Sequence, residues 1–152
     1  MPEIEMKLKK IEHDGVNISL PKRGTEGSAG MDLFAAICEP IAIAPGGLVR
    51  IPTGIAIGLP GDGCVGLVYA RSGLAIKHGI ALSNGVGVID SDYRGEIIVG
   101  LCNVSGATYT VEPGERIAQL VIAPVYTANI IETDNLDKTG REAGGFGSTG
   151  RY

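Results

Sequence analysis

The stretch N-G-V-G-V-I-D-S-D-Y-R-G-E, residues 84–96, places a polar turn between two apolar runs. The run Gly85–Ile89 precedes the turn and the run Glu96–Cys102 follows it, which predicts a β-hairpin with residues 90–95 as its loop. The loop carries two carboxylates, a tyrosine and an arginine. Loops that hold such groups between well-formed strands more often serve binding or chemistry than packing. We therefore expect the functional site at this hairpin.

Two other interpretations of the same loop have to be weighed. Residues 90–95 begin like a calcium-binding EF-hand loop, with glycine at the sixth position. The fifth position is Arg94, however, and the twelfth is Leu101, where a bidentate glutamate is needed. The loop could also be a plain solvated turn, because Asp, Ser and Gly are ordinary turn formers. Taken alone, the plain turn would be favoured, so the rest of the chain has to decide.

The composition indicates one all-β domain. A chain of 152 residues can bury a core, roughly 68–70% of its unfolded surface. The 24 glycines, the many Val and Ile residues and the scarcity of helical periodicity favour strands. No apolar run approaches the ~20 residues of a membrane span, and Met1–Lys10 alternates charged and apolar residues, unlike a signal peptide. We expect a cytoplasmic protein that does not contact a membrane.

Charge and cysteine usage exclude several classes of function. The net charge of −4 argues against a general nucleic-acid surface, so we expect no nucleic-acid partner. An acidic protein can still bind a polyphosphate where arginines and main-chain N–H groups converge. Cys38, Cys64 and Cys102 are odd in number and form no C-x-x-C pair. They are predicted to be buried, reduced thiols rather than disulfides or zinc ligands.

The segment Ala70–Gly79 is the only convincing helical turn in the sequence. Ser72 is its predicted N-cap and Gly79 its predicted C-terminal stop. A helix start that follows Arg71 and offers a hydroxyl and free N–H groups is suited to an anion. A capped surface turn with an incidental arginine explains the same residues equally well, and the local sequence leaves both open.

Two polar residues lie inside apolar runs and need partners. Asp32 lies in the short run Ala29–Ala35, where a lone buried carboxylate would be costly, so we expect it to brace a neighbouring loop or arginine. Gln119 lies in the apolar run Ile117–Val125. A buried amide needs a hydrogen-bond partner, which we expect a subunit interface or a ligand to supply.

The chain changes character after Pro124. Residues 127–140 are polar and residues 141–152 are rich in glycine, a composition that by default predicts a disordered tail. The glycine spacing of residues 145–150 matches the dinucleotide fingerprint only formally, because no βαβ unit surrounds it. Phe146 stands alone among glycines, near Arg141, Ser148 and Thr149. This pattern predicts a mobile arm that closes over a flat ring and its phosphates.

Five segments occur in a diagnostic order and spacing. They are A-G-M-D-L-F-A (29–35), A-R-S-G-L-A (70–75), the stretch at 84–96, G-E-R-I-A-Q-L (114–120) and G-G-F-G-S-T-G (144–150). Together they resemble the homotrimeric dUTP pyrophosphatase (dUTPase) family over essentially the whole chain. The resemblance implies an all-β, distorted jelly-roll domain of the β-clip type over residues 1–126. It also implies that residues 127–152 form a linker and a C-terminal arm that closes over an active site shared within a homotrimer.

The resemblance also implies roles for individual residues. Asp90 matches the aspartate that activates the attacking water, and Tyr93 would lie against the deoxyribose. Uracil would be bound partly through main-chain groups near Gly87 and Ile89. Asp32 and Arg116 would support the site without touching substrate, and Gln119 would be donated by a neighbouring subunit. The other residues implied in substrate binding are Arg71, Ser72 and Gly73 for the phosphates, Asn84 and Val88 at the base, and Arg141, Phe146, Gly147, Ser148 and Thr149 in the arm.

The implied reaction is the hydrolysis of dUTP to dUMP and pyrophosphate, which keeps uracil out of DNA and supplies dUMP. Mg²⁺ would be held by the substrate phosphates and waters, with no direct protein ligand. Two alternatives remain. One is a relative of the dCTP deaminase type, which needs a glutamate that acts on the base. The other is a non-catalytic trimeric jelly-roll binding protein, which would not need Asp90, Tyr93 and the arm together.

Overall fold

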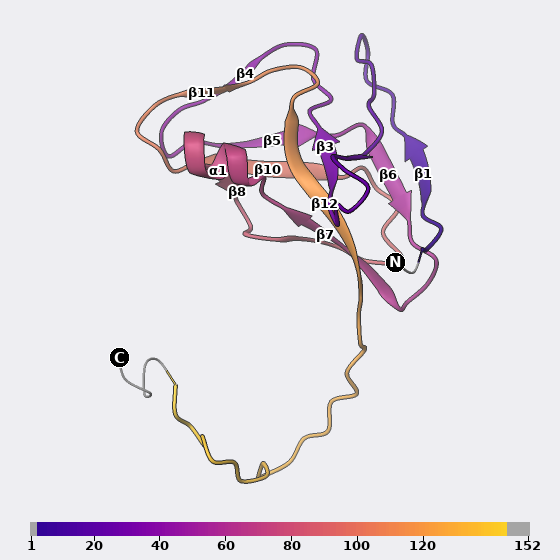
Figure 1. Ribbon diagram of the computed structural model, residues 1–152, viewed down its shortest axis with the longest axis vertical. Helices are drawn as coiled ribbons and strands as arrows, with labels where there is room; N and C mark the ends of the chain where they lie inside the picture. The colour runs from indigo at the N-terminus through magenta and orange to yellow at the C-terminus, as the bar shows by residue number, and fades with distance from the viewer. Residues whose placement is uncertain (1–2, 146–152) are drawn as a thin grey trace.

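Short strands joined by glycine- and proline-containing turns build the protein. The computed structural model describes residues 3–145, in which twelve strands and one helix form (Figure 1). In chain order they are β1 (Lys7–Lys10), β2 (Lys22–Arg23), β3 (Met31–Phe34), β4 (Ile41–Ile43), β5 (Leu48–Pro52), β6 (Ile55–Gly58), β7 (Cys64–Tyr69), α1 (Ser72–His78), β8 (Ile80–Leu82), β9 (Gly87–Ile89), β10 (Ile98–Asn103), β11 (Tyr109–Val111) and β12 (Arg116–Pro124). The prediction of an all-β fold is confirmed.

The strands pair antiparallel in four sheets. The largest has the order β2-β3-β12-β7-β9, and the second has the order β5-β10-β8. Two small ribbons, β1-β6 and β11-β4, complete the structure. Figure 1 shows β3 and β12 crossing in front of β5 and β10, so the two larger sheets form the two layers of a distorted jelly roll.

The core lies between these layers and is made of aliphatic side chains. Leu33 of β3 and Leu120 of β12 come from the five-stranded sheet, and Ile51 of β5 and Leu101 of β10 come from the three-stranded sheet; all four are buried. Full burial of such a side chain contributes about 1.5–3 kcal/mol. The two sheets are therefore held as a firm frame for the loops at their ends.

The predicted hairpin at residues 84–102 is wrong in its pairing. β9 pairs with β7 in the five-stranded sheet, whereas β10 lies between β5 and β8 in the other sheet. The loop between them crosses from one layer to the other. It is fixed at its second end, where the Ile97 N–H donates to the Ile55 carbonyl (2.8 Å) and the Thr53 N–H donates to the Ile97 carbonyl (3.2 Å).

The helix forms where it was predicted, but its first residue differs in role. Arg71 occupies the N-cap position with extended backbone, and no side-chain capping hydrogen bond is made, so the prediction of Ser72 as N-cap is wrong. Gly79 ends the helix as expected, at φ 66°, and its N–H donates to the Ala75 carbonyl (3.0 Å). A side chain at this glycine would also collide with Ser105.

Residues beyond β12 leave the body of the protein. Within residues 125–145 no further strand or helix forms, and the segment extends away from the two layers (Figure 1). Tyr126, Ile130, Ile131 and Leu136 are large apolar side chains with 98, 90, 79 and 87% of their surface exposed.

Two smaller expectations can be compared with the structure. All three cysteines are free, as predicted, but Cys38 is exposed and the other two are only partly buried. The expected burial is therefore wrong for Cys38 and holds only in part for Cys64 and Cys102. In the part of the chain from 3 to 145, no helix is both long and apolar enough to serve as a transmembrane span.

Candidate active site

One group of predicted site residues gathers where β3, β12 and β7 run side by side. In the strand register Gln119 of β12 lies opposite both Asp32 of β3 and Tyr69 of β7. Arg71 follows Tyr69 by two residues, and Arg116 opens β12. The antiparallel pairing therefore brings together three segments that are far apart in the sequence, in a cluster that we call the phosphate-side half.

Asp32 joins the two arginines of this half. The Arg71 Nε donates to Asp32 Oδ1 (2.9 Å), and the Arg116 Nη1 donates to Asp32 Oδ2 (3.3 Å). Arg71 also donates from Nη1 to the Arg116 carbonyl (3.2 Å). The prediction that Asp32 braces an arginine is confirmed, and it braces two. Two guanidinium groups against one carboxylate leave a net positive charge.

Gln119 finds its hydrogen-bond partner within the same chain. Its Nε2 donates to the Ala70 carbonyl (3.0 Å), so the chain itself supplies the partner that we expected from an interface or a ligand. This bond ties β12 to the residue just before Arg71. Its Oε1 faces Gly30, where an added Cβ would lie 2.6 Å away, so a larger residue at position 30 would displace the Gln119 amide.

The phosphate-side half opens on a hollow of about 450 Å³. Asp32, Arg71, Arg116 and Gln119 line it together with the loop at 24–30. The predicted phosphate residues Ser72 and Gly73 form the first turn of α1 beside it; both are exposed, and an added Cβ at Gly73 would meet nothing within 4 Å. Arginine guanidinium groups next to an open surface suit phosphate oxygens, which they can contact through two N–H groups at once.

The second group of predicted residues forms the loop after β9. Asp90 accepts a hydrogen bond from the Tyr93 N–H at its main-chain carbonyl (3.1 Å), which closes a turn. Arg94 Nη1 donates to the carbonyls of Ser91 (2.7 Å) and Tyr93 (2.8 Å). The Tyr93 hydroxyl donates to the Glu96 carbonyl (3.0 Å). We call residues 90–96 the tyrosine loop.

β9 itself carries the residues expected to bind the base. Gly87 and Ile89 are half-buried, whereas Asn84 and Val88 are exposed. β9 is an edge strand of the five-stranded sheet and pairs only with β7 in the described part of the chain. Its outer edge therefore presents main-chain N–H and C=O groups without a neighbouring strand, as recognition of a base through the main chain requires.

The two groups do not meet within one chain. Ile89 pairs with Gly66, so Asp90 lies near the start of β7, whereas Arg71 follows the end of β7. Five residues of extended chain span roughly 15–20 Å. Asp90 opens instead on a separate hollow of about 510 Å³ that it shares with Asp62, Ser91 and Asp92.

The predicted arm is only partly described. The Arg141 Nε donates to the Gly144 carbonyl (2.7 Å), and Arg141 is exposed on the segment that extends from the body. Phe146, Gly147, Ser148 and Thr149 lie outside the described residues. Of the site residues predicted in the arm, Arg141 is therefore the one that lies within the described residues.

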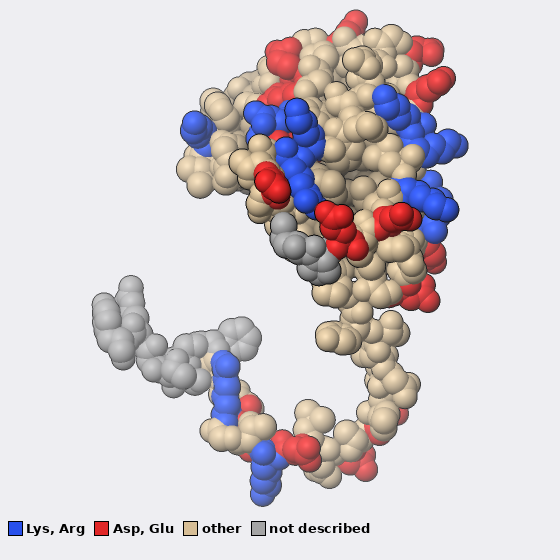
Figure 2. All heavy atoms as spheres, turned by 45° about the vertical axis from the view of Figure 1, so that its right-hand side comes forward, with Lys and Arg blue, Asp and Glu red and all other residues tan. Residues whose placement is uncertain are grey.

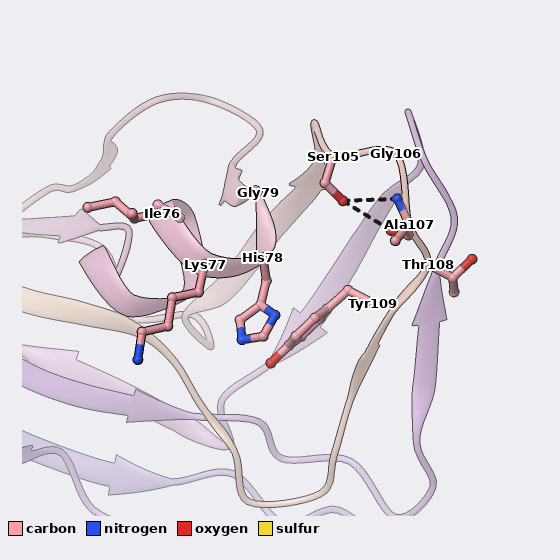
Figure 3. A pocket seen from close by; sticks show the side chains of 10 residues that line it. Ile76, Lys77, His78, Gly79, Ser105, Gly106, Ala107, Thr108 and Tyr109 are labelled. Atoms are coloured by element: carbon pink, nitrogen blue, oxygen red, sulfur yellow. Dashed lines mark hydrogen bonds between the residues drawn. The ribbon is translucent and has the colours of Figure 1, made fainter.

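Another hollow, of about 500 Å³, lies at the C-terminal end of α1 (Figure 3). His78 and Tyr109 face each other across it, with ring centroids 5.0 Å apart. Burial and the hydrogen bond from its hydroxyl to Glu115 raise the pKa of Tyr109 above its ordinary value. None of the predicted site residues lines this hollow, so we do not assign the reaction to it.

The charged and amide side chains around the 450 Å³ hollow are of a kind that binds phosphate. Over residues 3–145, no group of three or more His, Cys, Asp or Glu side chains is arranged to hold a metal ion. The donors around the 450 Å³ hollow are instead guanidinium and amide N–H groups. On the face shown in Figure 2, basic and acidic side chains alternate over the body. Basic side chains therefore form no single broad patch on this face.

Comparison with known proteins places this geometry in a family. The family model described as dUTPase matches residues 16–150. The chain belongs to the dUTPase family. A deoxyuridine 5'-triphosphate nucleotidohydrolase of Desulfitobacterium hafniense (strain DSM 10664 / DCB-2) is 50% identical over 150 residues, which cover 99% of each chain. The resemblance drawn from the five sequence segments is confirmed, and this dUTPase-family member is an enzyme.

Solved structures agree with the fold. The Staphylococcus bacteriophage 80alpha dUTPase with dUPNHPP has a TM-score of 0.85 at 28% identity and covers 96% of this chain and 98% of its own. A variant of the dUTPase from phage phi11 of S. aureus, described with a structural Mg(II) ion, has a TM-score of 0.75 at 25% identity. The match covers 86% of this chain and 97% of the phage chain. These neighbours share the distorted jelly roll, and they favour the dUTPase interpretation over the two alternatives.

Sequence reasoning missed two residues that shape the tyrosine loop. Glu96 accepts hydrogen bonds from the Gly54 N–H (2.7 Å) and from His13 Nε2 (2.8 Å) through the same carboxylate oxygen, Oε1. The available signal was a carboxylate next to a buried strand, because a carboxylate at such a position needs hydrogen-bond donors or an ion-pair partner. His13 offered no signal, since its partner is 83 residues away.

Proposed function

We propose that this dUTPase-family member hydrolyses dUTP to dUMP and pyrophosphate at a cleft that two or more copies of the chain complete. The observation that carries the proposal is the pair of arginines held by Asp32 beside Gln119, because it forms an open, positively charged site for a triphosphate. The tyrosine loop, with Asp90, supplies the reacting group. In this role the enzyme would keep uracil out of DNA and supply dUMP.

A shared site follows from the distance between the two halves. Asp90 and Arg71 lie at opposite ends of β7, so one chain cannot present both to one nucleotide. A second copy that places its tyrosine loop over the phosphate-side half resolves this. A closed ring of three identical contacts gives a homotrimer with three such sites.

The extended segment after β12 supports the same assembly. Its exposed apolar residues, among them Tyr126 and Ile130, make no buried contact with the body of their own chain and would be covered by a neighbouring copy. We propose a core domain of residues 1–126 and a linker and arm of residues 127–152 that reaches another copy. In that arrangement Arg141, Ser148 and Thr149 would hold the γ-phosphate, and Phe146 beside Gly147 would stack on the base.

Selection of the nucleotide would use the edge of β9 and the tyrosine loop. Main-chain groups at Gly87 and Ile89, flanked by Asn84 and Val88, would pair with the uracil edge. A site with fixed donors and acceptors rejects a base of the wrong pattern by up to ~10⁴–10⁵, because its polar groups are left unpaired. The ring of Tyr93, packed against the deoxyribose, would leave no space for a 2′-hydroxyl.

For the chemical step, Asp90 would accept a proton from a water that attacks the α-phosphorus. Arg71, the first turn of α1 at Ser72 and Gly73, and Gln119 would hold the phosphate oxygens and stabilise the charge that develops there. When present, Mg²⁺ would neutralise phosphate charge as part of the bound nucleotide. Asp32 and Arg116 would support Arg71.

Three free thiols suit a reducing compartment, and we propose a cytoplasmic location.

Pyrophosphate release from each dNTP and from UTP, with Mg²⁺, tests this proposal. We expect kcat/KM for dUTP to exceed that for UTP and for every other dNTP by a large factor. Asp90→Asn should lower kcat by about 10²–10⁴, the usual contribution of a general base, while nucleotide affinity stays within about threefold. Equal cleavage of dUTP, dTTP and UTP, or normal turnover by Asp90→Asn, would contradict it.

A further inference from the structure

The tyrosine loop is bound to the jelly roll through one carboxylate. Glu96 Oε1 accepts hydrogen bonds from the Gly54 N–H (2.7 Å) and from His13 Nε2 (2.8 Å). The Glu96 side chain is only 16% exposed, so water has little access to its carboxylate and competes weakly with these two hydrogen bonds. Gly54 lies in the turn between β5 and β6, and His13 lies in the segment after β1. Glu96 therefore ties the end of the loop to two distant parts of the frame.

The ring of Tyr93 is in turn fixed on the residues next to Glu96. Its hydroxyl donates to the Glu96 carbonyl (3.0 Å). The ring lies directly over Gly95, where an added Cβ would come within 2.3 Å of the hydroxyl oxygen and 2.6 Å of Cζ. Tyr93 nevertheless keeps 43% of its surface exposed. One part of the ring is thus held against the loop while another part remains open.

We propose that Glu96 is a positioning residue for sugar selectivity, which acts by holding the Tyr93 ring in place over Gly95. The inference rests on the proposed function, in which Tyr93 packs against the deoxyribose. Exclusion of a ribose by a ring works only while the ring cannot move aside, since a misplacement of about 1 Å can already change a rate by about 10²-fold. The carboxylate of Glu96 supplies this stiffness from a distance and does not touch the nucleotide.

The measurement is the ratio of kcat/KM for dUTP to kcat/KM for UTP. In Glu96→Ala both hydrogen bonds to Gly54 and His13 are lost, and we expect the ratio to fall about tenfold or more, with an increased KM for dUTP. In Glu96→Gln the amide oxygen can still accept from Gly54, so we expect most of the selectivity to return. A purely structural role would lower both kcat/KM values in proportion and leave their ratio unchanged.

A matched control comes from a second glutamate with similar bonding. Glu115 accepts hydrogen bonds from the Tyr109 hydroxyl and the Glu112 N–H, but it lies away from the tyrosine loop. Glu115→Ala should destabilise the protein yet keep the dUTP/UTP ratio within about twofold. If Glu96→Ala does not fold, Gly95→Ala takes its place, because its Cβ displaces the Tyr93 ring and leaves the Glu96 carboxylate bonded.

A double variant separates positioning from a direct effect. In a Tyr93→Ala background, Glu96→Ala should not lower the ratio further, because the residue through which it acts is gone. The proposal is wrong if Glu96→Ala, or Gly95→Ala in its place, keeps the wild-type ratio while Tyr93→Ala loses it. A wild-type protein that cleaves UTP as well as dUTP would instead refute the proposed function itself.

Discussion

Asp32 shows best what one residue contributes to this site. Its two carboxylate oxygens hold Arg71 and Arg116 at 2.9 and 3.3 Å. Because both arginines are partly exposed, each ion pair contributes only about 1 kcal/mol or less to stability. Its main effect is therefore on the direction in which the guanidinium groups point.

We expect Asp32→Asn to lower kcat for dUTP by about tenfold, because the amide cannot hold both guanidinium groups in the same orientation. KM should change less than about threefold. Removal of the Asp32 negative charge makes the site more positive, and the stronger attraction of the phosphates offsets part of the lost alignment. Steady-state kinetics measures both. Asp14→Asn, the same change at an exposed position, is the control. An unchanged kcat in Asp32→Asn would show that the bracing has no catalytic consequence.

The sequence predicted which polar residues require a hydrogen-bond or ion-pair partner better than it predicted which residue the partner is. An aspartate in the run 29–35 had to be paired, and it is. Gln119 also had to be satisfied, but the acceptor is the Ala70 carbonyl and not another subunit. Partner choice depends on strand register, which joins residues 49 positions apart in this case and is not encoded in local spacing.

At the scale of elements, the turn after β10 depends on one buried amide. Asn103 is 1% exposed, and its Nδ2 donates to the carbonyls of Ile43 (2.8 Å) and Ala107 (2.7 Å). Its Oδ1 accepts from the Ser105 N–H (2.9 Å) and hydroxyl (2.7 Å). The Asn103 side chain thus supplies hydrogen-bond partners to a carbonyl of β4 and to main-chain groups of the turn.

Asn103→Ala should reduce the free energy of unfolding by about 2–4 kcal/mol, because it leaves buried carbonyl and N–H groups unpaired. Urea titration followed by circular dichroism measures this. Asn135→Ala, at an exposed position in the extended segment, should change it by less than about 0.5 kcal/mol. Equal stabilities of the two variants would contradict the role given to Asn103.

Tyr109 predicts a pH dependence of stability. Burial, and then the hydrogen bond to Glu115, raise its pKa in the folded protein above the ordinary value of 10.0. The folded state therefore keeps a proton that the unfolded state loses, so this contribution is complete below pH 10 and falls as the pH rises above it. The stability difference between wild type and Tyr109→Phe should shrink above that pH. A difference that stays constant to high pH would contradict this.

Which elements form was easier to predict than how they pair. The helix at 72–78 and the strands around the tyrosine loop were expected, because glycine, serine and apolar runs mark their ends. The expected hairpin was wrong because β9 and β10 belong to different sheets. Two apolar strands joined by a short turn normally pair; here the bonds of Ile97 to Thr53 and Ile55 direct the second strand to the other layer.

At the scale of the whole molecule, the two groups of residues that we propose for the site do not meet within one chain. The jelly roll holds the arginines and the tyrosine loop rigidly at opposite ends of β7. The fold class was predictable from composition and from the five segments. The separation of Asp90 from Arg71 was not, because it depends on the direction of β7 relative to β9.

Complementation between two inactive variants tests the shared cleft most directly. Chains with Arg71→Ala and chains with Asp90→Asn, carrying different affinity tags, are co-expressed, and assemblies with both tags are purified. In a ring of three with a site between neighbours, any mixture has one site with both native residues. Pyrophosphate release from dUTP should then recover to about one third of the wild-type value. No recovery above the single variants would show that Asp90 and Arg71 act from the same chain.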